Sequence, residues 1–249
     1  MPGPDSREVH LRMVRLEASE DDYALASRWL TEDETARAKR FYFDRHRQAF
    51  VLGRAVLRGL LATYLGIAPA EVRFIYGPQG KPGLALHHIN DACPLQFNVS
   101  NSGNLAAYAF TTGCEIGVDV EQHRPLHDFE NIAHRFFSPE ETAELMELPS
   151  EERNTGFFNC WSRKEAYIKA MGGGLSIPLD SFRVTLRPGV ATRMVSLGGS
   201  EDAARAWSMH AFDPGPGYAG AIAYRAEPRS VRGSSIVSVD ELLAEMSFE

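Results

Sequence analysis

The chain has few cysteines, no long hydrophobic run and no excess of positive charge, and each shortage excludes a class of protein. Its three cysteines, Cys93, Cys114 and Cys160, are odd in number and lack C-x-x-C spacing, so we expect neither a disulfide framework nor a structural zinc site. Residues 1–12 are polar, and no apolar run is long enough to span a bilayer. The net charge of −7 gives no general attraction to nucleic acid or to an anionic membrane. We therefore expect a cytoplasmic protein with neither of these partners.

Helical and strand patterns alternate along the chain in an order that occurs twice. Helical periodicity covers 22–65, with an N-cap signature at 31–34, and returns over 131–147 and 155–171. Short strand-like runs separated by Gly, Asn and Pro lie at 72–76, 95–100, 105–111, 116–121, 182–186, 206–212 and 218–224. The order predicts an α+β fold of two similar subdomains, related by a pseudo-two-fold axis. Each subdomain is a long helix on a small antiparallel sheet, one over residues 1–114 and the other over 115–249.

Two acidic residues lie on the predicted strand that opens the second half. The alternation places Ile116, Val118 and Val120 on one face, and Asp119 and Glu121 together on the other. Two carboxylates about 7 Å apart repel modestly in water, but a bound Mg²⁺ ion would reverse the sign of that interaction. Taken alone, the strand favours a solvated edge over a metal site.

A third acid is placed in an apolar helical stripe. Glu165 falls between Trp161 and Ile168 at helical spacing, where an unpaired ionised carboxylate would be costly. Lys169, four residues later, could neutralise it through a salt bridge within the helix. The same lysine could instead bind phosphate beside a metal-binding glutamate, and the helix pattern does not separate the two interpretations.

Several basic or small polar residues could contact an anion. Arg47, Arg54 and Arg58 share one face of the helix that ends near residue 65, which predicts either an anion, acidic partners or a solvated basic face. Lys81 stands between turn formers in a loop that is not a phosphate-cradling P-loop. The small polar turn over 100–104 can present hydroxyl and N–H groups to an anion, although most such turns are only connections.

The order of five motifs gives these residues a common context. They are Gly80-Lys81-Pro82, Phe97-Asn98-Val99-Ser100-Asn101-Ser102-Gly103, Ile116-Gly117-Val118-Asp119-Val120-Glu121, Arg135-Phe136-Phe137-Ser138 and Trp161-Ser162-Arg163-Lys164-Glu165-Ala166-Tyr167-Ile168-Lys169. In this order the chain resembles the Sfp-type 4′-phosphopantetheinyl transferases. The resemblance extends over about 41–182, and the two acidic motifs are the signature of that family.

The resemblance implies a two-subdomain fold with coenzyme A in the cleft between the halves. It further implies a transferase that moves the 4′-phosphopantetheine group onto a serine of an apo acyl or peptidyl carrier protein. The positions that match the magnesium-binding acids of the family are Asp119, Glu121 and Glu165, and Lys169 matches its lysine near the pyrophosphate. Those that match its coenzyme A contacts are Lys81, Ser100, Asn101 and, on the helix that contacts the 3′-phosphate, Arg47.

Two departures from the family pattern remove positive charge. Asn101 stands where the family usually has histidine, and residues 172–174 are all glycine where it has Gly-Lys-Gly. Because asparagine donates hydrogen bonds but carries no charge, weaker binding of coenzyme A or a changed pH response is expected.

The implied mechanism is attack of the carrier serine on the β-phosphorus of coenzyme A, with 3′,5′-adenosine bisphosphate leaving. Glu165 is the expected general base, directly or through a metal-bound water, and Lys169 the residue that neutralises the leaving phosphate. Two other functions compete: a non-catalytic module that binds carrier proteins or coenzyme A, and a Mg²⁺-dependent phosphohydrolase or nuclease. His123 stands where the nuclease pattern has lysine, which disfavours the latter. Since both halves lie in one chain, we expect a monomer.

Overall fold

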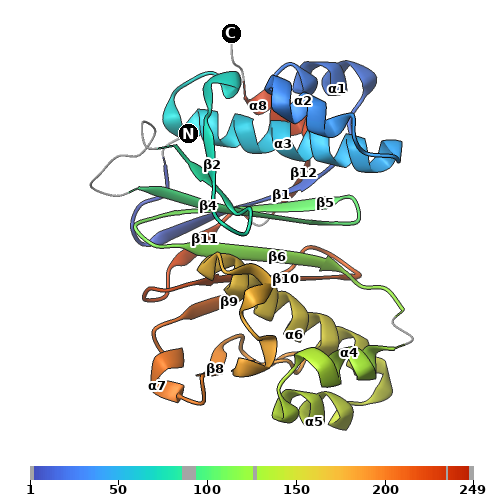
Figure 1. Cartoon of the computed structure of the whole chain (residues 1–249), viewed down its shortest axis with the longest axis vertical. Coiled ribbons are helices and arrows are strands. Elements are labelled where there is room, and N and C mark those ends of the chain that lie inside the picture. Colours follow the sequence, from blue (N-terminus) through green and yellow to red (C-terminus); the bar gives the residue numbers. More distant parts are fainter. Residues whose placement is uncertain (1–2, 86–93, 126–127, 234, 247–249) are drawn as a thin grey trace.

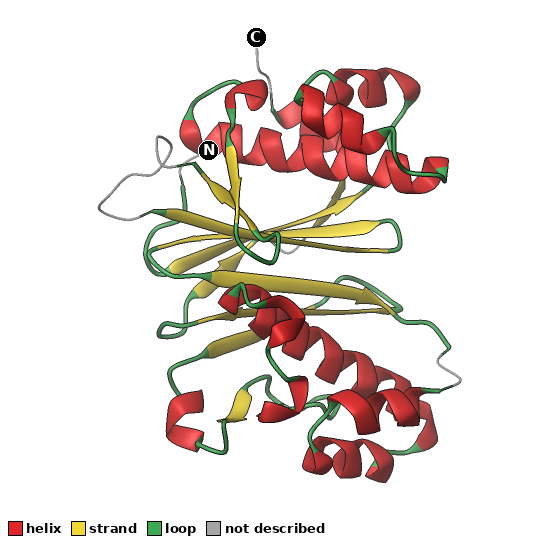
Figure 2. Cartoon of the chain, viewed as in Figure 1, coloured by secondary structure: helices red, strands yellow, loops and turns green. Residues whose placement is uncertain are grey.

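The computed structural model describes residues 3–85, 94–125, 128–233 and 235–246. Figure 1 shows four layers in the order helices, sheet, sheet, helices, and Figure 2 shows that the helices lie only on the two outer sides. The α+β prediction is therefore confirmed. Cys93 lies outside the described residues. None of the described helices is long and apolar enough to cross a membrane.

The first half begins with a strand and a helical layer. Its elements are β1 (Glu8–Arg15), α1 (Glu20–Ser27), α2 (Glu32–Ala38), α3 (Asp44–Leu65), the hairpin β2 (Phe74–Tyr76) and β3 (Pro82–Leu84), β4 (Leu95–Ser102) and β5 (Leu105–Thr112). The three long strands form an antiparallel sheet in the order β1-β5-β4. The helix α3 ends at Gly66, whose φ of 68° is a left-handed conformation that glycine adopts readily.

The second half repeats this arrangement. Its elements are β6 (Ile116–Gln122), α4 (Phe129–Phe136), α5 (Pro139–Glu147), α6 (Ser150–Met171), the hairpin β7 (Phe182–Val184) and β8 (Met194–Leu197), α7 (Glu201–Ala204), β9 (Ser208–Phe212) and β10 (Tyr218–Tyr224). The sheet order β6-β10-β9 matches β1-β5-β4, because each half runs strand, long helix, hairpin, then two paired strands. Both α3 and α6 contain 22 residues.

Three hydrophobic layers hold the four structural layers together. One lies between α3 and the first sheet, one between α6 and the second sheet, and the third between the two sheets. The strand β5 faces two of them, because Tyr108 and Phe110 point to the helical side while Ala107 and Ala109 face the other sheet. Its sequence therefore consists of apolar residues at nearly every position instead of alternating with polar ones.

The C-terminal segment returns to the first half. The strands β11 (Ser230–Arg232) and β12 (Ile236–Ser238) pair in parallel with β1, and α8 (Val239–Glu245) packs against α3. Residues 230–245, which the sequence-based division groups with the second half, thus complete the first. Because β5 and β10 each lead into the other half, the chain crosses between the sheets twice.

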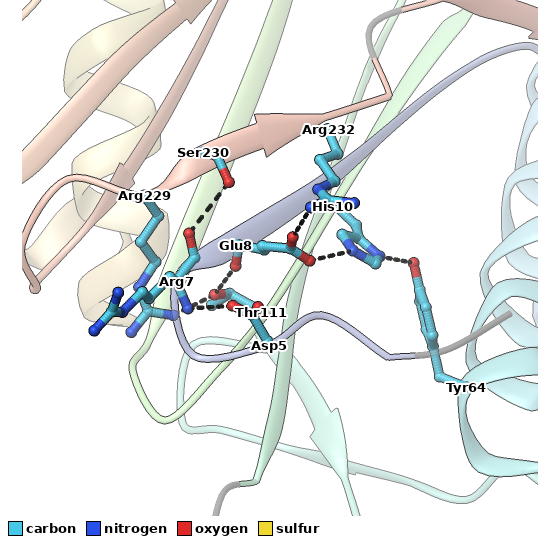
Figure 3. A network of polar contacts seen from close by, with 9 residues as sticks. All are labelled: Asp5, Arg7, Glu8, His10, Tyr64, Thr111, Arg229, Ser230 and Arg232. Carbon is cyan, nitrogen blue, oxygen red and sulfur yellow. Dashed lines mark hydrogen bonds and ion pairs between the residues drawn. The ribbon is translucent and has the colours of Figure 1, made fainter.

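A polar network that is buried at Glu8 and His10 and exposed at Arg232 links the returning strand to β1 (Figure 3). The carboxylate of Glu8 forms an ion pair with Arg232 of β11 and contacts Nε2 of His10 at 3.3 Å, while Nδ1 of His10 lies 3.0 Å from the Tyr64 hydroxyl. Burial lowers the pKa of His10, in keeping with a neutral ring that donates to Glu8 and accepts from Tyr64.

Candidate active site

The candidate site lies where one edge of each sheet meets the other. Edge strand β4 of the first sheet runs beside edge strand β6 of the second, and side chains of β4 bond across the gap. The Oδ1 atom of Asn98 accepts a hydrogen bond from the N–H group of Val118 at 3.0 Å, and Ser100 Oγ donates to Asp119 Oδ1 at 2.9 Å. The acidic strand of one half is therefore held by polar residues of the other.

Asp119 is the most buried acid of the site, with 2 % of its surface exposed. Its Oδ1 atom accepts a second bond, from Lys169 Nζ at 2.6 Å, but its buried Oδ2 atom has no hydrogen-bond partner among the residues that the structure describes. Burial raises the pKa of Asp119 to about 7, although the Lys169 charge opposes this shift. The arrangement leaves one buried carboxylate oxygen available to a further cation or donor.

Glu121 is held in the same way one step further along the two strands. Its Oε2 atom accepts a hydrogen bond from Ser102 Oγ at 2.9 Å, and Ser102 in turn accepts from the N–H group of Gln122 at 3.0 Å. Our sequence reasoning did not single out Ser102. The signal was present, since Ser100 and Ser102 are two residues apart on a strand and so share a face.

The helix α6 brings the third acid and a lysine to the strand. It lies so close to β6 that a Cβ atom added at Gly117 would be 2.0 Å from the carbonyl oxygen of Ala166. Glu165 is half-buried, and burial raises its pKa while Lys169 lowers it and Glu121 raises it. Lys169 bonds to Ser100 at 2.8 Å and to Asp119, so it is directed across the site rather than back along the helix to Glu165. The salt bridge within the helix, one of the two sequence-based interpretations, is not the contact that Lys169 makes.

The three acids affect one another electrostatically without forming a compact cluster. Within the described ranges, no three His, Cys, Asp or Glu side chains are placed so that they could together hold a metal ion. The charge of Glu121 nevertheless raises the pKa of both Asp119 and Glu165.

A cavity of about 270 Å³ opens beside Glu165 and Lys169. It is lined by Gln79, Gly80, Lys81, Pro82, Asn98, Val99, Glu165, Ile168, Lys169, Gly172 and Gly174. Lys81 ties the β2–β3 hairpin across this cavity, because its Nζ atom bonds to Glu115 at 2.6 Å and to the carbonyl oxygen of Ala170 at 3.0 Å. This lysine thus joins the hairpin of the first half to the end of α6.

A larger cavity of about 840 Å³ lies between the start of α3 and the turn that follows β4. Its lining includes Arg37, Arg45, His46 and Asn101. Arg47 is not among the lining residues and pairs with Asp44 of its own helix at 2.5 Å. Asn101 therefore lines this cavity and Arg47 does not, whereas Arg37, Arg45 and His46 do. In the sequence, the high density of basic residues over 37–47 is the pattern that indicates such residues beside Arg47.

The other two arginines of the α3 face are structural. Arg58 is 2 % exposed, and its Nε atom bonds to Glu34 at 2.7 Å. Arg54 lies 3.5 Å from the same carboxylate. Of the three possibilities raised by the sequence, acidic partners are the one observed for this pair.

Comparison with known proteins gives one consistent family. The model described as "4'-phosphopantetheinyl transferase superfamily" matches residues 115–223, and the one described as "4'-phosphopantetheinyl transferase, N-terminal" matches 15–113. The 4'-phosphopantetheinyl transferase HetI of Nostoc is 38 % identical over 218 residues, which cover 88 % of each chain.

A second relative agrees, and one solved structure matches part of the chain. The 4'-phosphopantetheinyl transferase Sfp of Bacillus subtilis is 31 % identical over 86 % of this chain and 90 % of its own length. Among solved structures, a holo-[acyl-carrier-protein] synthase of Thermotoga maritima matches 45 % of this chain and 62 % of its own, with 15 % identity and a TM-score of 0.33. The matches to HetI and Sfp, which cover most of each chain, confirm the resemblance read from the five motifs, and the chain belongs to the 4′-phosphopantetheinyl transferase superfamily, in its Sfp type.

Proposed function

We propose that the protein transfers the 4′-phosphopantetheine group of coenzyme A to a serine hydroxyl of an apo carrier protein, with Mg²⁺ as cofactor. The observation that carries the proposal is the meeting of Ser100, Asp119 and Lys169 at the junction of the two halves, beside a cavity. Lys169 can therefore pair either with the buried carboxylate of Asp119 or with a phosphate group in the cavity. This arrangement suits transfer of a phosphoryl-linked group, which depends on positioning and neutralised charge.

The donor set fits a magnesium ion. Asp119 supplies a buried oxygen that accepts no hydrogen bond from any described residue, and the charge of Glu121 acts on both Asp119 and Glu165. Because the described residues contain no three such side chains placed around one ion, one or two of these carboxylates together with substrate phosphates would hold it. Magnesium prefers such oxygen ligands and is commonly held by one or two carboxylates plus substrate phosphates. When bound, it would neutralise the pyrophosphate charge and polarise the reacting phosphoryl group.

The chain's own residues account for the proton and for the leaving group. Glu165 accepts the proton of the carrier serine, a role favoured by the raised pKa of its half-buried carboxylate. As the serine Oγ–phosphorus bond forms, the bond between the β-phosphorus and the bridging oxygen breaks, and 3′,5′-adenosine bisphosphate departs. Lys169 donates to the phosphate oxygens on which negative charge increases.

Coenzyme A would span the two cavities. We place its pyrophosphate beside Lys169 and Lys81 in the smaller cavity, and its 3′-phosphate in the larger one. Arg37 and Arg45 supply positive charge there and His46 supplies a ring nitrogen, a role that the resemblance assigned to Arg47. Asn101 lines the same cavity and contributes an uncharged amide.

The test is to incubate the protein with apo carrier protein, coenzyme A and Mg²⁺ and to record the intact mass of the carrier. We expect a gain of one phosphopantetheine group that EDTA abolishes. Asp119→Ala should reduce the rate by orders of magnitude with the fold intact, whereas Glu201→Ala, at an exposed acid of α7, should keep it. No gain across fatty-acid, polyketide and peptide carriers would favour the non-catalytic binding module. Hydrolysis of a generic phosphodiester would favour the phosphohydrolase.

We also infer that one chain is a complete catalytic unit. Ser100 comes from the first half and Asp119, Glu121, Glu165 and Lys169 from the second, so no residue of the site has to be supplied by another copy. Light scattering during size-exclusion chromatography should give the mass of a monomer, and the activity per chain should not change on dilution.

A further inference from the structure

Lys169 pairs with the same carboxylate that an incoming cation would use. Its ammonium group contacts Asp119 Oδ1 at 2.6 Å and Ser100 Oγ at 2.8 Å, so two of its three N–H bonds are used inside the site. It also lines the 270 Å³ cavity, and 28 % of its side chain is exposed. The lysine therefore stands at the boundary between a buried acid and an open cavity.

One buried carboxylate cannot hold two cations at full strength. The oxygen that faces Lys169 already accepts two hydrogen bonds, and the other oxygen of Asp119 is buried and bonds to no residue in the described part of the chain. A divalent cation at the second oxygen would repel an ammonium group that stays on the first. The flexible lysine, which opens onto the cavity, is the partner that can leave.

We propose that Lys169 is an exchangeable counter-ion, held by Asp119 in the free protein and transferred to a phosphate of coenzyme A when a divalent cation arrives. This inference rests on the proposed function and adds the order in which Lys169 changes its ion-pair partner. Metal alone must displace the lysine into water, whereas metal together with coenzyme A gives the lysine a new anionic partner. Metal and coenzyme A should therefore strengthen each other's binding, by the same factor in both directions.

The first test measures Mn²⁺ binding directly by electron paramagnetic resonance, without coenzyme A, under argon at pH 8.5 where protons compete least with cations. We expect Lys169→Met to bind Mn²⁺ about tenfold more tightly than the wild type, equivalent to about 1.4 kcal/mol. The matched control is Lys81→Met. It removes the same charge from the same cavity, but Lys81 pairs with Glu115, so its Mn²⁺ affinity should change less than about twofold.

The second test uses the unmodified chain. Acylation of Lys169 by acetic anhydride, followed by mass spectrometry of its peptide, should increase several-fold when Mg²⁺ is added and decrease when coenzyme A is added as well. Equal or weaker Mn²⁺ binding by Lys169→Met, or unchanged acylation of Lys169 at saturating Mg²⁺, would overturn the inference. If the wild type transfers phosphopantetheine in the mass assay but fails these two tests, the exchange of Lys169 is refuted while the proposed function stands. If it also fails the mass assay, the proposed function itself is refuted.

Discussion

Replacement of Gly117 by alanine should separate the helix α6 from the strand β6. The added Cβ atom would lie 2.0 Å from the carbonyl oxygen of Ala166 and 2.4 Å from the backbone nitrogen of Ala170. Both obstacles are backbone atoms of one helix, so no side-chain rotation relieves them. The helix must retreat by about 1 Å to restore even a short normal contact of about 3 Å, a rearrangement typical of an overpacked core.

This retreat should affect stability and activity to different extents. Overpacking costs about 1–3 kcal/mol, and two backbone contacts argue for the upper end of that range. Because Lys169 and Glu165 move with the helix while Asp119 stays on the strand, the transfer rate should fall by about 10²-fold, as expected for a misplacement of about 1 Å. Urea denaturation followed by circular dichroism measures the first quantity, and the carrier mass assay measures the second.

A matched substitution of the same chemical type is available in α3. A Cβ atom at Gly53 would be 3.6 Å from the Tyr108 hydroxyl and 3.8 Å from Leu16, ordinary contacts, and alanine is the better helix residue by about 0.5–1 kcal/mol. Gly53→Ala should therefore unfold at the same or higher urea concentration as the wild type. If Gly117→Ala matched the wild type in stability and rate, the close approach of α6 to β6 would not be what positions the site.

Three further predictions concern buried charges and the returning segment. Asp119→Asn should lose transfer activity, yet in EDTA it should become more stable relative to the wild type as pH rises. Folding raises the pKa of Asp119 from 3.8 to about 7, so protonation of this group stabilises the folded wild type fully below pH 3.8, and that stabilisation is lost as pH rises through 7. Thermal denaturation at pH 5 and 8 tests the sign. Glu141→Gln should destabilise by about 3–5 kcal/mol, because it leaves Lys164 buried without its 2.7 Å ion-pair partner, and equal urea midpoints would refute this. Leu242→Ala in α8 should cost about 2–5 kcal/mol in the same assay if the returning segment is part of the first core, whereas an effect below about 1 kcal/mol would mean that it is not.

The regular elements were predictable from the sequence where periodicity and end signals agree. The end of α6 at Gly172 agrees with the helical pattern predicted over 155–171, because glycine fixes this end through local backbone chemistry. The path of the chain after residue 229 was not. The short strands β11 and β12 pair with a strand more than two hundred residues earlier, and such a pairing leaves no local signal.

The site was predictable as a list of residues but not as a set of contacts. The family motifs gave Asp119, Glu165 and Lys169, yet helical spacing alone allowed the lysine to pair within its own helix. What decides its direction is the buried carboxylate on β6, which a sequence cannot place against α6. The basic residues of the larger cavity show the same limit, since the rotation of α3 decides that Arg45 faces the cavity and Arg47 does not.

The chain crosses between the two halves twice, and the geometry of the site therefore depends on the stability of the fold. Asp119 and Glu121 are held by Ser100 and Ser102 of the other half, so the acids keep their geometry only while the two sheets stay together. One crossing between the halves would act as a single hinge, but the second, which leads from β10 to β11 and ends in the core beside α3, opposes opening about that hinge. A substitution far from the chemistry, such as the one at Leu242, should therefore weaken Mn²⁺ binding together with folding. Lys169→Met, by contrast, should tighten that binding, although it removes the ion-pair partner of the buried Asp119.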